Sequence, residues 1–140
     1  MLKIKLLNEN AIAPKKATTG AAGRDLAIYE RINISPQSDC LVPLGYAIEL
    51  PVGTVGQIWP RSSLDFKWKL TTGAGIIDQD YRGELKVLLR NLGDETIILE
   101  PGERIAQLVI LQLSSITMVE ICTNLETTIR NEGGFGSTGK

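Results

Sequence analysis

The fold class is indicated most directly by the stretch Tyr46-Ala47-Ile48-Glu49-Leu50-Pro51-Val52-Gly53. In its first five residues every second side chain is large and apolar, as a strand with one buried face requires. Pro51-Val52-Gly53 then reads as a turn. Similar short apolar runs occur at Leu2–Leu6, Ala27–Ile34, Val55–Trp59, Leu85–Leu89, Thr96–Leu99, Ile105–Leu113 and Ile116–Ile121. This spacing, roughly one run per 8–12 residues, predicts an all-β sandwich or jelly roll. Most prolines, Pro43 among them, stand at the edges of these runs, where a missing N–H does least harm to a sheet.

The chain is predicted to form a single domain, residues 1–140, because it contains no internal repeat and no linker. The best helix candidate is the short segment Ser62–Lys67 after Pro60. Residues 1–123 form the predicted β core. Arg130–Lys140 contains four glycines and one aromatic residue, so it buries too little surface to order itself. Residues 124–140 are therefore predicted to be a flexible, glycine-rich arm or lid.

Composition restricts the class of protein. The chain has 140 residues, 43% of them hydrophobic, which is enough for one sizeable core. No apolar run approaches the roughly 20 residues that cross a bilayer, and no signal-peptide core is present, so no membrane partner is expected. An intracellular location is expected, cytoplasmic by default or nuclear for a eukaryotic or viral source. The net charge of −1 gives no sign of a protein that neutralises DNA phosphates, so no nucleic-acid partner is expected.

The absence of histidine restricts the chemistry further. It removes Ser-His and Cys-His catalysis, histidine-ligated zinc and imidazole acid–base chemistry. Cys40 and Cys122 are far apart in sequence and are interpreted as buried, unreactive thiols. Any catalysis must rely on carboxylates, hydroxyls, backbone amides, Arg and Lys, or a metal that arrives with the ligand.

The C-terminal stretch Gly134-Phe135-Gly136-Ser137-Thr138-Gly139-Lys140 matches most of a P-loop. A P-loop needs a preceding strand and a following helix, and here the chain stops at the lysine. The Walker interpretation therefore fails. The glycine amides, the two hydroxyls and Arg130 could still wrap an anion, although an idle terminus is the ordinary interpretation of such a tail.

Two internal segments could also carry chemistry. The segment Trp59-Pro60-Arg61-Ser62-Ser63-Leu64 places an arginine and two hydroxyls at the start of the short helix. This arrangement could bind a phosphate, or it could be an ordinary helix N-cap beside a surface arginine. Gly73–Gly83 describes a hairpin whose tip carries Asp78 and Tyr81. Asp is common in turns because it bonds its own backbone, so this segment alone favours an ordinary turn.

Taken together and in order, five segments resemble the five signature motifs of the trimeric dUTPase family. They read AAGRDL, PRSSL, GAGIIDQDYRG, GERIAQL and RNEGGFGSTG, and they extend from Ala21 to Gly139. The resemblance implies a jelly-roll (β-clip) domain assembled as a homotrimer with three shared active sites. It implies a dUTP diphosphatase that hydrolyses dUTP to dUMP and pyrophosphate by water attack on the α-phosphate. Such an enzyme keeps uracil out of DNA and supplies dUMP for dTMP synthesis.

The resemblance also implies a role for each site residue. Asp78 is the expected general base, and Tyr81 lies under the deoxyribose and excludes a 2′-hydroxyl. Ser62, the Ser63 amide and Gln107 hold phosphate oxygens, while Arg61 braces the site. The uracil edge is expected to meet backbone atoms between Thr72 and Lys86, including those of Gly75, Ile76 and Ile77. The arm is expected to stack Phe135 on uracil and to close Arg130, Gly136, Ser137 and Thr138 over the phosphates.

In the same way, the resemblance implies Mg²⁺ bound mainly by the triphosphate and water, with Asp25 as an outer-shell anchor. One subunit would supply Asp25, the Arg61–Ser63 turn and Gln107, a second the Asp78–Tyr81 hairpin, and the third its arm. The departures from the family pattern are mild: Arg24, Ser63, Trp68, Lys86 and Asn131 replace more usual residues. Asn131 tolerates a left-handed backbone, so the hinge of the arm is expected to survive.

Two alternatives remain open at this point. A dCTP deaminase has a similar fold but needs a glutamate on the strand after the hairpin, and the matching position is Leu88. Glu84 would share a face with Leu88 on an unbroken strand, but it lies four residues too early. A non-catalytic binding module of the same fold would be expected to have lost Asp78, Tyr81 or the tail, and all three are present.

Overall fold

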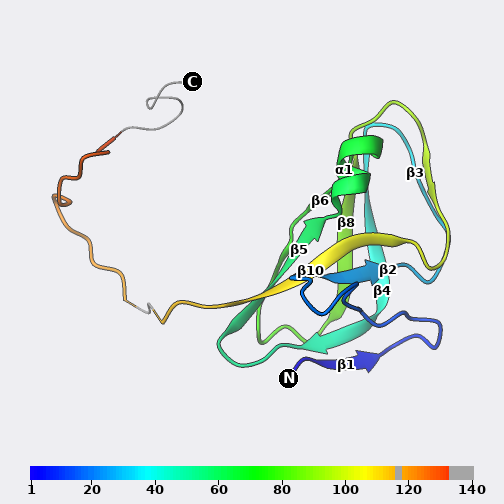
Figure 1. Ribbon diagram of the computed structural model, residues 1–140, viewed down its shortest axis with the longest axis horizontal. Coiled ribbons are helices and arrows are strands. Elements are labelled where there is room, and N and C mark those ends of the chain that lie inside the picture. Colours follow the sequence, from blue (N-terminus) through cyan, green and yellow to red (C-terminus); the bar gives the residue numbers. More distant parts are fainter. Residues whose placement is uncertain (116–117, 133–140) are drawn as a thin grey trace.

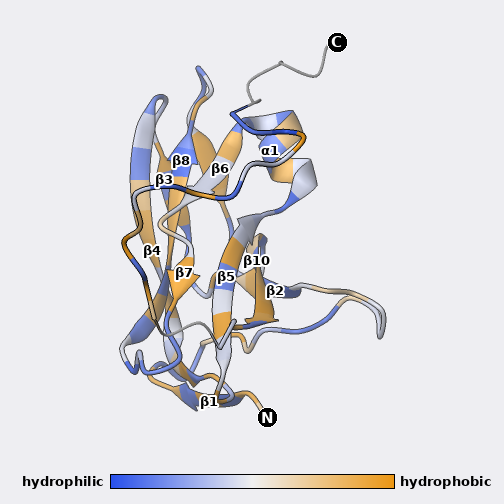
Figure 2. Cartoon of the chain, turned by 90° about the vertical axis from the view of Figure 1, so that its left-hand side faces the viewer, coloured by the Kyte–Doolittle hydropathy of each residue, from blue (hydrophilic) through white to orange (hydrophobic). Residues whose placement is uncertain are grey.

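The computed structural model describes residues 1–115 and 118–132, and these form a β-sandwich with one short helix. Its first sheet has the order β1-β4-β8-β6 and its second the order β2-β10-β5-β7, while β3 and β9 pair separately. Figures 1 and 2 show the two sheets as facing layers, with α1 at one end. The all-β prediction is confirmed.

Every strand pair among the described residues is antiparallel. The first sheet contains β1 (Lys3–Leu6), β4 (Ser38–Glu49), β8 (Glu84–Asn91) and β6 (Leu70–Gly73). The second contains β2 (Arg24–Ala27), β10 (Arg104–Gln112), β5 (Thr54–Pro60) and β7 (Ile76–Ile77). The small pair is β3 (Ile32–Ile34) with β9 (Ile97–Leu99), and the helix is α1 (Ser62–Trp68).

The core lies between the two sheets and follows the alternation expected of half-buried strands. In β8 every second residue is buried, whereas Lys86 and Arg90 face outward. Fully buried side chains from both sheets meet here: Leu26, Val42, Leu44, Tyr46, Leu85, Val87, Leu89 and Leu108. Burial of each large apolar side chain contributes on the order of 1.5–3 kcal/mol, so this core supplies most of the stabilisation. Burial also raises the pKa of Tyr46, which stays a neutral phenol.

A buried asparagine fixes the far end of β8. The Asn91 amide donates to the carbonyl oxygens of Ile34, Ser35 and Glu95 at 3.1, 3.1 and 2.8 Å, and its own oxygen accepts from the Gly93 N–H at 2.9 Å. Asn91 is the one buried polar residue among those described. Its four contacts tie the end of β8 to the loops around β3 and β9.

Several sequence predictions need correction. The run Ala27–Ile34 divides between β2 and β3, and β4 begins eight residues before Tyr46. Pro43 lies inside β4 and not at its edge, and the pairing with β8 shifts register between Pro43 and Ala47. This irregularity accommodates a residue without an N–H.

The end of the chain also departs from expectation in part. The last strand ends at Gln112, residues 118–121 form no strand, and residues 116–117 lie outside the described part. Residues 118–132 are exposed and run away from the sandwich (Figure 1). Cys122 is therefore exposed, contrary to the prediction, whereas Cys40 is half-buried and burial raises its pKa. The predicted boundary at residue 123 stays a prediction. In the described residues, no helix has both the length and the apolar character needed to cross a membrane.

Candidate functional site

The predicted hairpin is formed by β7 and the turn that follows it. β7 pairs with β5 through Ile77 opposite Gly56, and Asp78 comes directly after the strand. The Tyr81 N–H donates to the Asp78 carbonyl at 3.2 Å, and the Tyr81 hydroxyl donates to the Glu84 carbonyl at 3.0 Å. These two bonds fix the tyrosine ring beside the aspartate.

Asp78 and Tyr81 line one pocket, named here the Asp78 pocket. Its volume is about 260 Å³, and it is lined by Leu41, Ile76, Ile77, Asp78, Tyr81, Glu84 and Lys86. The wall is mostly apolar, the Tyr81 ring is 43% exposed, and the Asp78 carboxylate reaches solvent. Such a pocket can take a flat or cyclic apolar group and place a base beside it. Five of the predicted site residues meet here.

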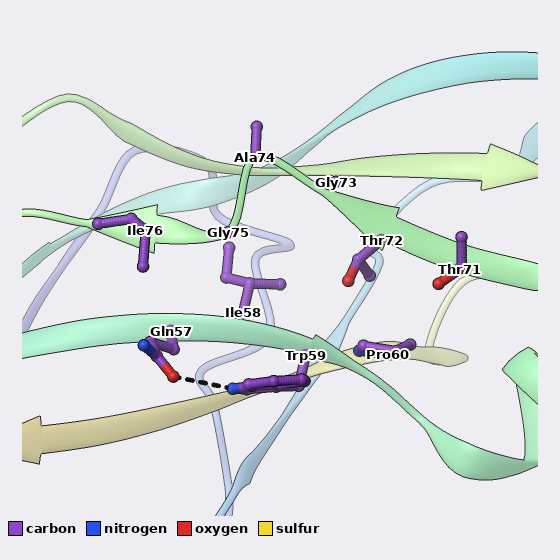
Figure 3. Close-up of a pocket in the computed structure, with 10 residues that line it drawn as sticks. All are labelled: Gln57, Ile58, Trp59, Pro60, Thr71, Thr72, Gly73, Ala74, Gly75 and Ile76. Carbon is purple, nitrogen blue, oxygen red and sulfur yellow. Dashed lines mark hydrogen bonds between the residues drawn. The ribbon is translucent and has the colours of Figure 1, made fainter. Parts of the chain in front are cut away.

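A second pocket opens between β5 and the β6–β7 connection (Figure 3). It has a volume of about 340 Å³, and its lining includes Thr72, Gly75 and Ile76. The Ile58 N–H donates to the Gly75 carbonyl at 2.8 Å, and a Cβ at position 75 would lie only 2.5 Å from the Ile58 oxygen. Glycine is therefore needed here for the close approach of two backbones. Thr72 and Gly75 line this pocket and not the Asp78 pocket, while Ile76 lines both.

A cluster of charged and polar side chains, named here the Asp25 cluster, lies where β2, β10 and β5 meet. It contains Asp25, Arg61, Arg104 and Gln107. Asp25 accepts from Arg61 Nε at 3.2 Å through one oxygen and from Arg104 Nη1 at 3.1 Å through the other. The Gln107 amide donates to the Pro60 carbonyl at 3.0 Å, and Gln107 pairs with Asp25 across the strands. Two arginines and one carboxylate leave a net positive charge, which suits a polyanion.

The helix begins beside this cluster. Ser62 and Ser63 are the first two residues of α1, and both are exposed. Arg61 is the N-cap residue, and no side chain caps the helix. The predicted helix Ser62–Lys67 is confirmed, with one more residue at its end. Arg61, Ser62 and Ser63 thus follow one another at the edge of the Asp25 cluster, as the sequence predicted.

One chain does not bring the Asp78 pocket to the Asp25 cluster. Gln107 pairs with Trp59, whereas Ile77 pairs with Gly56 on the opposite edge of β5. At about 3.3 Å per residue along a strand and about 4.8 Å between strands, Gln107 and Ile77 lie roughly 14 Å apart. Apart from Thr72 and Gly75, which line the second pocket, the predicted site residues on the sandwich therefore form two groups, around the Asp78 pocket and around the Asp25 cluster.

The predicted arm is described only as far as residue 132. Arg130 is exposed in the segment that leaves the sandwich, and Asn131 has the left-handed backbone (φ 46°) for which its side chain is suited. Phe135, Gly136, Ser137 and Thr138 lie outside the described residues.

A directly bound metal would need several carboxylate, imidazole or thiolate ligands close together. Within residues 1–115 and 118–132, no three carboxylate or cysteine side chains come together as a metal cage. Asp25 is the carboxylate of the Asp25 cluster, and both of its oxygens contact guanidinium groups. Asp25 is therefore not part of a protein cage among the described residues, and its outer-shell contact to a hydrated metal stays a prediction.

Sequence reasoning missed three residues of the two groups. Arg104 lies in the GERIAQL segment, but the sequence alone does not indicate its contact with Asp25. Leu41 belongs to no motif, because it reaches the Asp78 pocket through the pairing of β4 with β8, in which it lies opposite Leu88. Glu84 was considered only as a deaminase residue. Its carboxylate accepts from the Gly45 N–H at 3.0 Å, so it braces the β4–β8 pair. β8 is unbroken, and Glu84 and Leu88 share a face as predicted.

Comparison with known proteins gives a consistent result. The sequence model of the dUTPase family matches residues 9–139. A deoxyuridine 5′-triphosphate nucleotidohydrolase from Hydrogenobaculum sp. is 48% identical over 141 residues, which cover 99% of this chain and 97% of that relative. The enzyme of the same name from Paramecium bursaria Chlorella virus 1 is 42% identical, with 99% and 97% covered.

Solved structures agree with the sequence relatives. A dUTPase of Staphylococcus bacteriophage 80alpha with dUpNHpp superimposes with a TM-score of 0.91 at 28% identity and covers 100% of this chain and 99% of that chain. A dUTPase from phage phi11 of S. aureus, described with a structural Mg(II) ion, has a TM-score of 0.80 at 25% identity and covers 86% and 96%. With a family match over nearly its whole length and relatives well above 30% identity, this chain belongs to the dUTPase family.

Proposed function

We propose that this protein is a dUTP diphosphatase that hydrolyses dUTP to dUMP and pyrophosphate by water attack on the α-phosphorus. Membership of the dUTPase family supports the reaction, and the relatives named above carry that activity in their names. The observation that carries the assignment of the site is the Asp78 pocket, where a carboxylate and a tyrosine ring meet at the tip of one hairpin.

The Asp78 pocket, together with the second pocket that Thr72 and Gly75 line, binds the nucleoside half of dUTP. The Tyr81 ring, held by its bond to the Glu84 carbonyl, lies under the deoxyribose and leaves no room for a 2′-hydroxyl. Uracil pairs with backbone atoms between Thr72 and Lys86, among them those of Gly75, Ile76 and Ile77. Asp78 accepts a proton from the attacking water. A carboxylate suits this role in a chain that has no histidine.

The Asp25 cluster binds the triphosphate half. Gln107, the Ser62 hydroxyl and the Ser63 amide contact phosphate oxygens, and Arg61 adds positive charge at the start of α1. Arg130, Phe135, Gly136, Ser137 and Thr138 then close the site from the arm. Closure excludes bulk water, which strengthens each of these charged contacts.

Mg²⁺ is part of the proposal. The phosphates and water molecules hold the ion, and Asp25 anchors it through its hydration shell, because the described residues offer no protein cage. When bound, the metal offsets phosphate charge in the transition state. The phi11 relative, which is described with a structural Mg(II) ion, supports a metal requirement for this chain.

The active form is a homotrimer with shared sites. The distance between the Asp78 pocket and the Asp25 cluster within one chain supports this arrangement, since each would meet the complementary half of another subunit. The outer face of the second sheet also supports it. Trp59, Ile76 and Leu111 are 53%, 60% and 44% exposed there, and an apolar surface of this kind is typical of a protein interface.

A nucleotide panel tests the reaction. The purified protein is incubated with Mg²⁺ and each of dUTP, dCTP, dTTP and UTP, and products are identified. Release of dUMP and pyrophosphate from dUTP alone, lost in Asp78→Asn, is the expected result. Ammonia from dCTP would replace the proposal with a deaminase. Tight dUTP binding without turnover would replace it with a non-catalytic nucleotide-binding role.

Subunit mixing tests the shared sites. Asp78→Asn and Arg61→Gln trimers are each expected to be inactive, but each retains one intact half-site. After dissociation and random reassembly at equal amounts, about one quarter of the sites would combine both intact halves, since each half is intact in about half of the subunits. Recovery of about a quarter of wild-type activity is expected. No recovery, with subunit exchange verified by mass spectrometry, would contradict sharing.

A further inference from the structure

The strand pairing that positions Asp78 ends one residue before it. β7 pairs with β5 as far as Ile77, which lies opposite Gly56. Asp78 is the next residue, and it is exposed. Continued in the same antiparallel register, the pairing would place Gln79 opposite Thr54. Because β7 ends at Ile77, the residues after Asp78 need another anchor to stay beside β5.

A side chain provides this anchor. The Gly53 N–H donates to Gln79 Oε1 at 2.7 Å. Gly53 directly precedes β5, so the contact joins the residue after Asp78 to the strand with which β7 pairs. Arg82 Nη1 also donates to the Gln79 carbonyl at 2.7 Å, which holds the backbone of the same residue. Asp78 is thereby fixed from both sides, by the sheet pairing of Ile77 and by the contacts of Gln79.

The turn that receives the Gln79 side chain is itself anchored. The N–H and the hydroxyl of Thr54 both donate to the Pro51 carbonyl, at 3.2 and 2.7 Å. The Gly53 carbonyl accepts from the Leu113 N–H at 2.8 Å, directly after the end of β10. Gly53 has a left-handed backbone (φ 74°), which glycine adopts without strain. These bonds make the turn a firm support, so the contact with Gln79 restricts the movement of the hairpin.

The exposure of this contact separates its effect on the base from its effect on the fold. Gln79 and Gly53 are both exposed, whereas the core lies between the two sheets. Water can replace an exposed hydrogen bond, so the fold does not depend on this one. Asp78 does depend on it, because a general base has to stay within hydrogen-bond reach of the water that it activates. A displacement of about 1 Å is enough to slow a reaction markedly.

We propose that Gln79 is a positioning residue, whose amide oxygen holds the hairpin on the turn of residues 51–54 and keeps the Asp78 carboxylate in place beside the attacking water. This inference rests on the proposed function. Gln79 is assigned no contact with the substrate. Loss of its oxygen is expected to lower kcat because the base moves. Nucleotide binding is expected to stay unchanged, because the Tyr81 ring is held separately by its bond to the Glu84 carbonyl.

The test compares Gln79→Met, Gln79→Asn and Gln79→Glu. Methionine removes the acceptor at similar length, asparagine is one methylene shorter, and glutamate keeps an acceptor oxygen at the same distance from the backbone. Three quantities are measured: kcat for dUTP, the Kd of the α,β-imido analogue of dUTP, and hydrogen exchange of the Gly53 amide by NMR.

The three substitutions are expected to differ in kcat and not in binding. For Gln79→Met and Gln79→Asn, kcat should fall about three- to tenfold, the factor that corresponds to one net hydrogen bond. Their Kd for the analogue should stay within about twofold of the wild type, and the Gly53 amide should exchange faster. Gln79→Glu should restore most of kcat and the protection of the Gly53 amide.

Gln37→Met is the matched control. Gln37 is also an exposed glutamine that joins two loops, and its amide donates to the carbonyl oxygens of Leu92 and Gly93 at 3.0 Å each. These carbonyls follow the far end of β8, whereas the hairpin precedes its first residue. The control is expected to keep the kcat and the Kd of the wild type.

Four outcomes would overturn the inference. The first is wild-type kcat in Gln79→Met, and the second is an unprotected Gly53 amide in the wild type, which would show that the contact is absent in solution. The third is a parallel loss of kcat and of analogue binding, which would indicate general disruption of the pocket. The fourth is an equal loss of kcat in Gln79→Met and Gln79→Glu. A wild type whose Gly53 amide is protected but which does not hydrolyse dUTP would instead refute the proposed function, and the inference with it.

Discussion

Replacement of Gly83 by alanine is expected to impair dUTP hydrolysis while leaving the fold intact. A Cβ at this position would lie 2.4 Å from the Tyr81 hydroxyl and 2.6 Å from the ring carbon that carries it. Ordinary contact begins near 3.4 Å, so the hydroxyl has to move by about 1 Å. The ring is 43% exposed and can move outward, which breaks its bond to the Glu84 carbonyl. The substrate pocket then loses its fixed wall.

The expected magnitudes differ sharply between activity and stability. A displacement of 1 Å in a positioning group costs up to about 100-fold in rate, so kcat/KM for dUTP should fall by roughly 30- to 100-fold. Loss of one exposed hydrogen bond costs about 1 kcal/mol, so the Tm should fall by no more than about 4 °C.

The assay compares steady-state kinetics on dUTP and UTP with thermal unfolding. The share of activity on UTP is expected to increase, because a displaced ring no longer excludes the 2′-hydroxyl. Gly20→Ala is the control, since a Cβ there meets nothing within 4 Å. Wild-type kcat/KM in Gly83→Ala, or an equal loss in the control, would refute the role given to the Tyr81 ring.

Three further predictions concern stability. In Gly75→Ala the new Cβ would lie 2.5 Å from the backbone oxygen of Ile58, which cannot move aside as a side chain can. The free energy of unfolding in urea should therefore fall by about 2 kcal/mol. An unchanged unfolding midpoint would contradict the close approach of the two backbones. Asn91→Ala removes four hydrogen bonds of a buried amide and should lower the free energy of unfolding by about 3 kcal/mol in the same assay. A decrease below about 1 kcal/mol would show that water replaces these hydrogen bonds. The hydrogen bond from Lys3 lowers the pKa of Glu49, so the stabilisation is present at neutral pH and is lost as pH falls through the lowered pKa. The Tm difference between wild type and Glu49→Gln should therefore shrink from pH 7 to pH 3, and a constant difference would contradict this.

The fold class could be predicted because the sandwich is built from local signals. The alternation from Tyr46 to Leu50 and the frequent turns predict half-buried strands, and the short helix after Pro60 was predicted to within one residue. These features depend on neighbours within a few positions, which a single sequence contains.

The wrong predictions concern features of the structure that tertiary contacts determine. Pro43 lies inside β4 at a position that β1 does not reach, next to a register shift in the pairing with β8. The run Ala27–Ile34 is interrupted by Glu30 and Arg31, and it divides between β2 in one sheet and β3 in another. Periodicity alone does not show where the chain leaves one sheet for the other. Cys122 has an ordinary apolar neighbour, Ile121, yet lies in a segment that leaves the sandwich.

The two groups of site residues show the same division. Asp78 and Tyr81 are three residues apart, and a hairpin brings them together without help from distant segments. Arg104 and Asp25 are far apart in sequence and meet only because β10 pairs with β2 and carries a bulge at its first residues. A motif indicates that such a residue matters, but the contact of Arg104 with Asp25 depends on the face to which the bulge turns the side chain.

The position of the two groups on β5 links the fold to the proposed assembly. β5 separates the Asp78 pocket on one edge from the Asp25 cluster on the other, and neither edge can be moved without breaking the pairing with β7 or β10. A rigid sheet therefore cannot close the roughly 14 Å between the two groups within one chain. In the proposed assembly, a substrate that needs both binds where the pocket of one subunit faces the cluster of another. Trp59 and Ile76 are exposed on the outer face of the second sheet. The proposed contact between subunits would bury these two side chains and complete the site on the same surface.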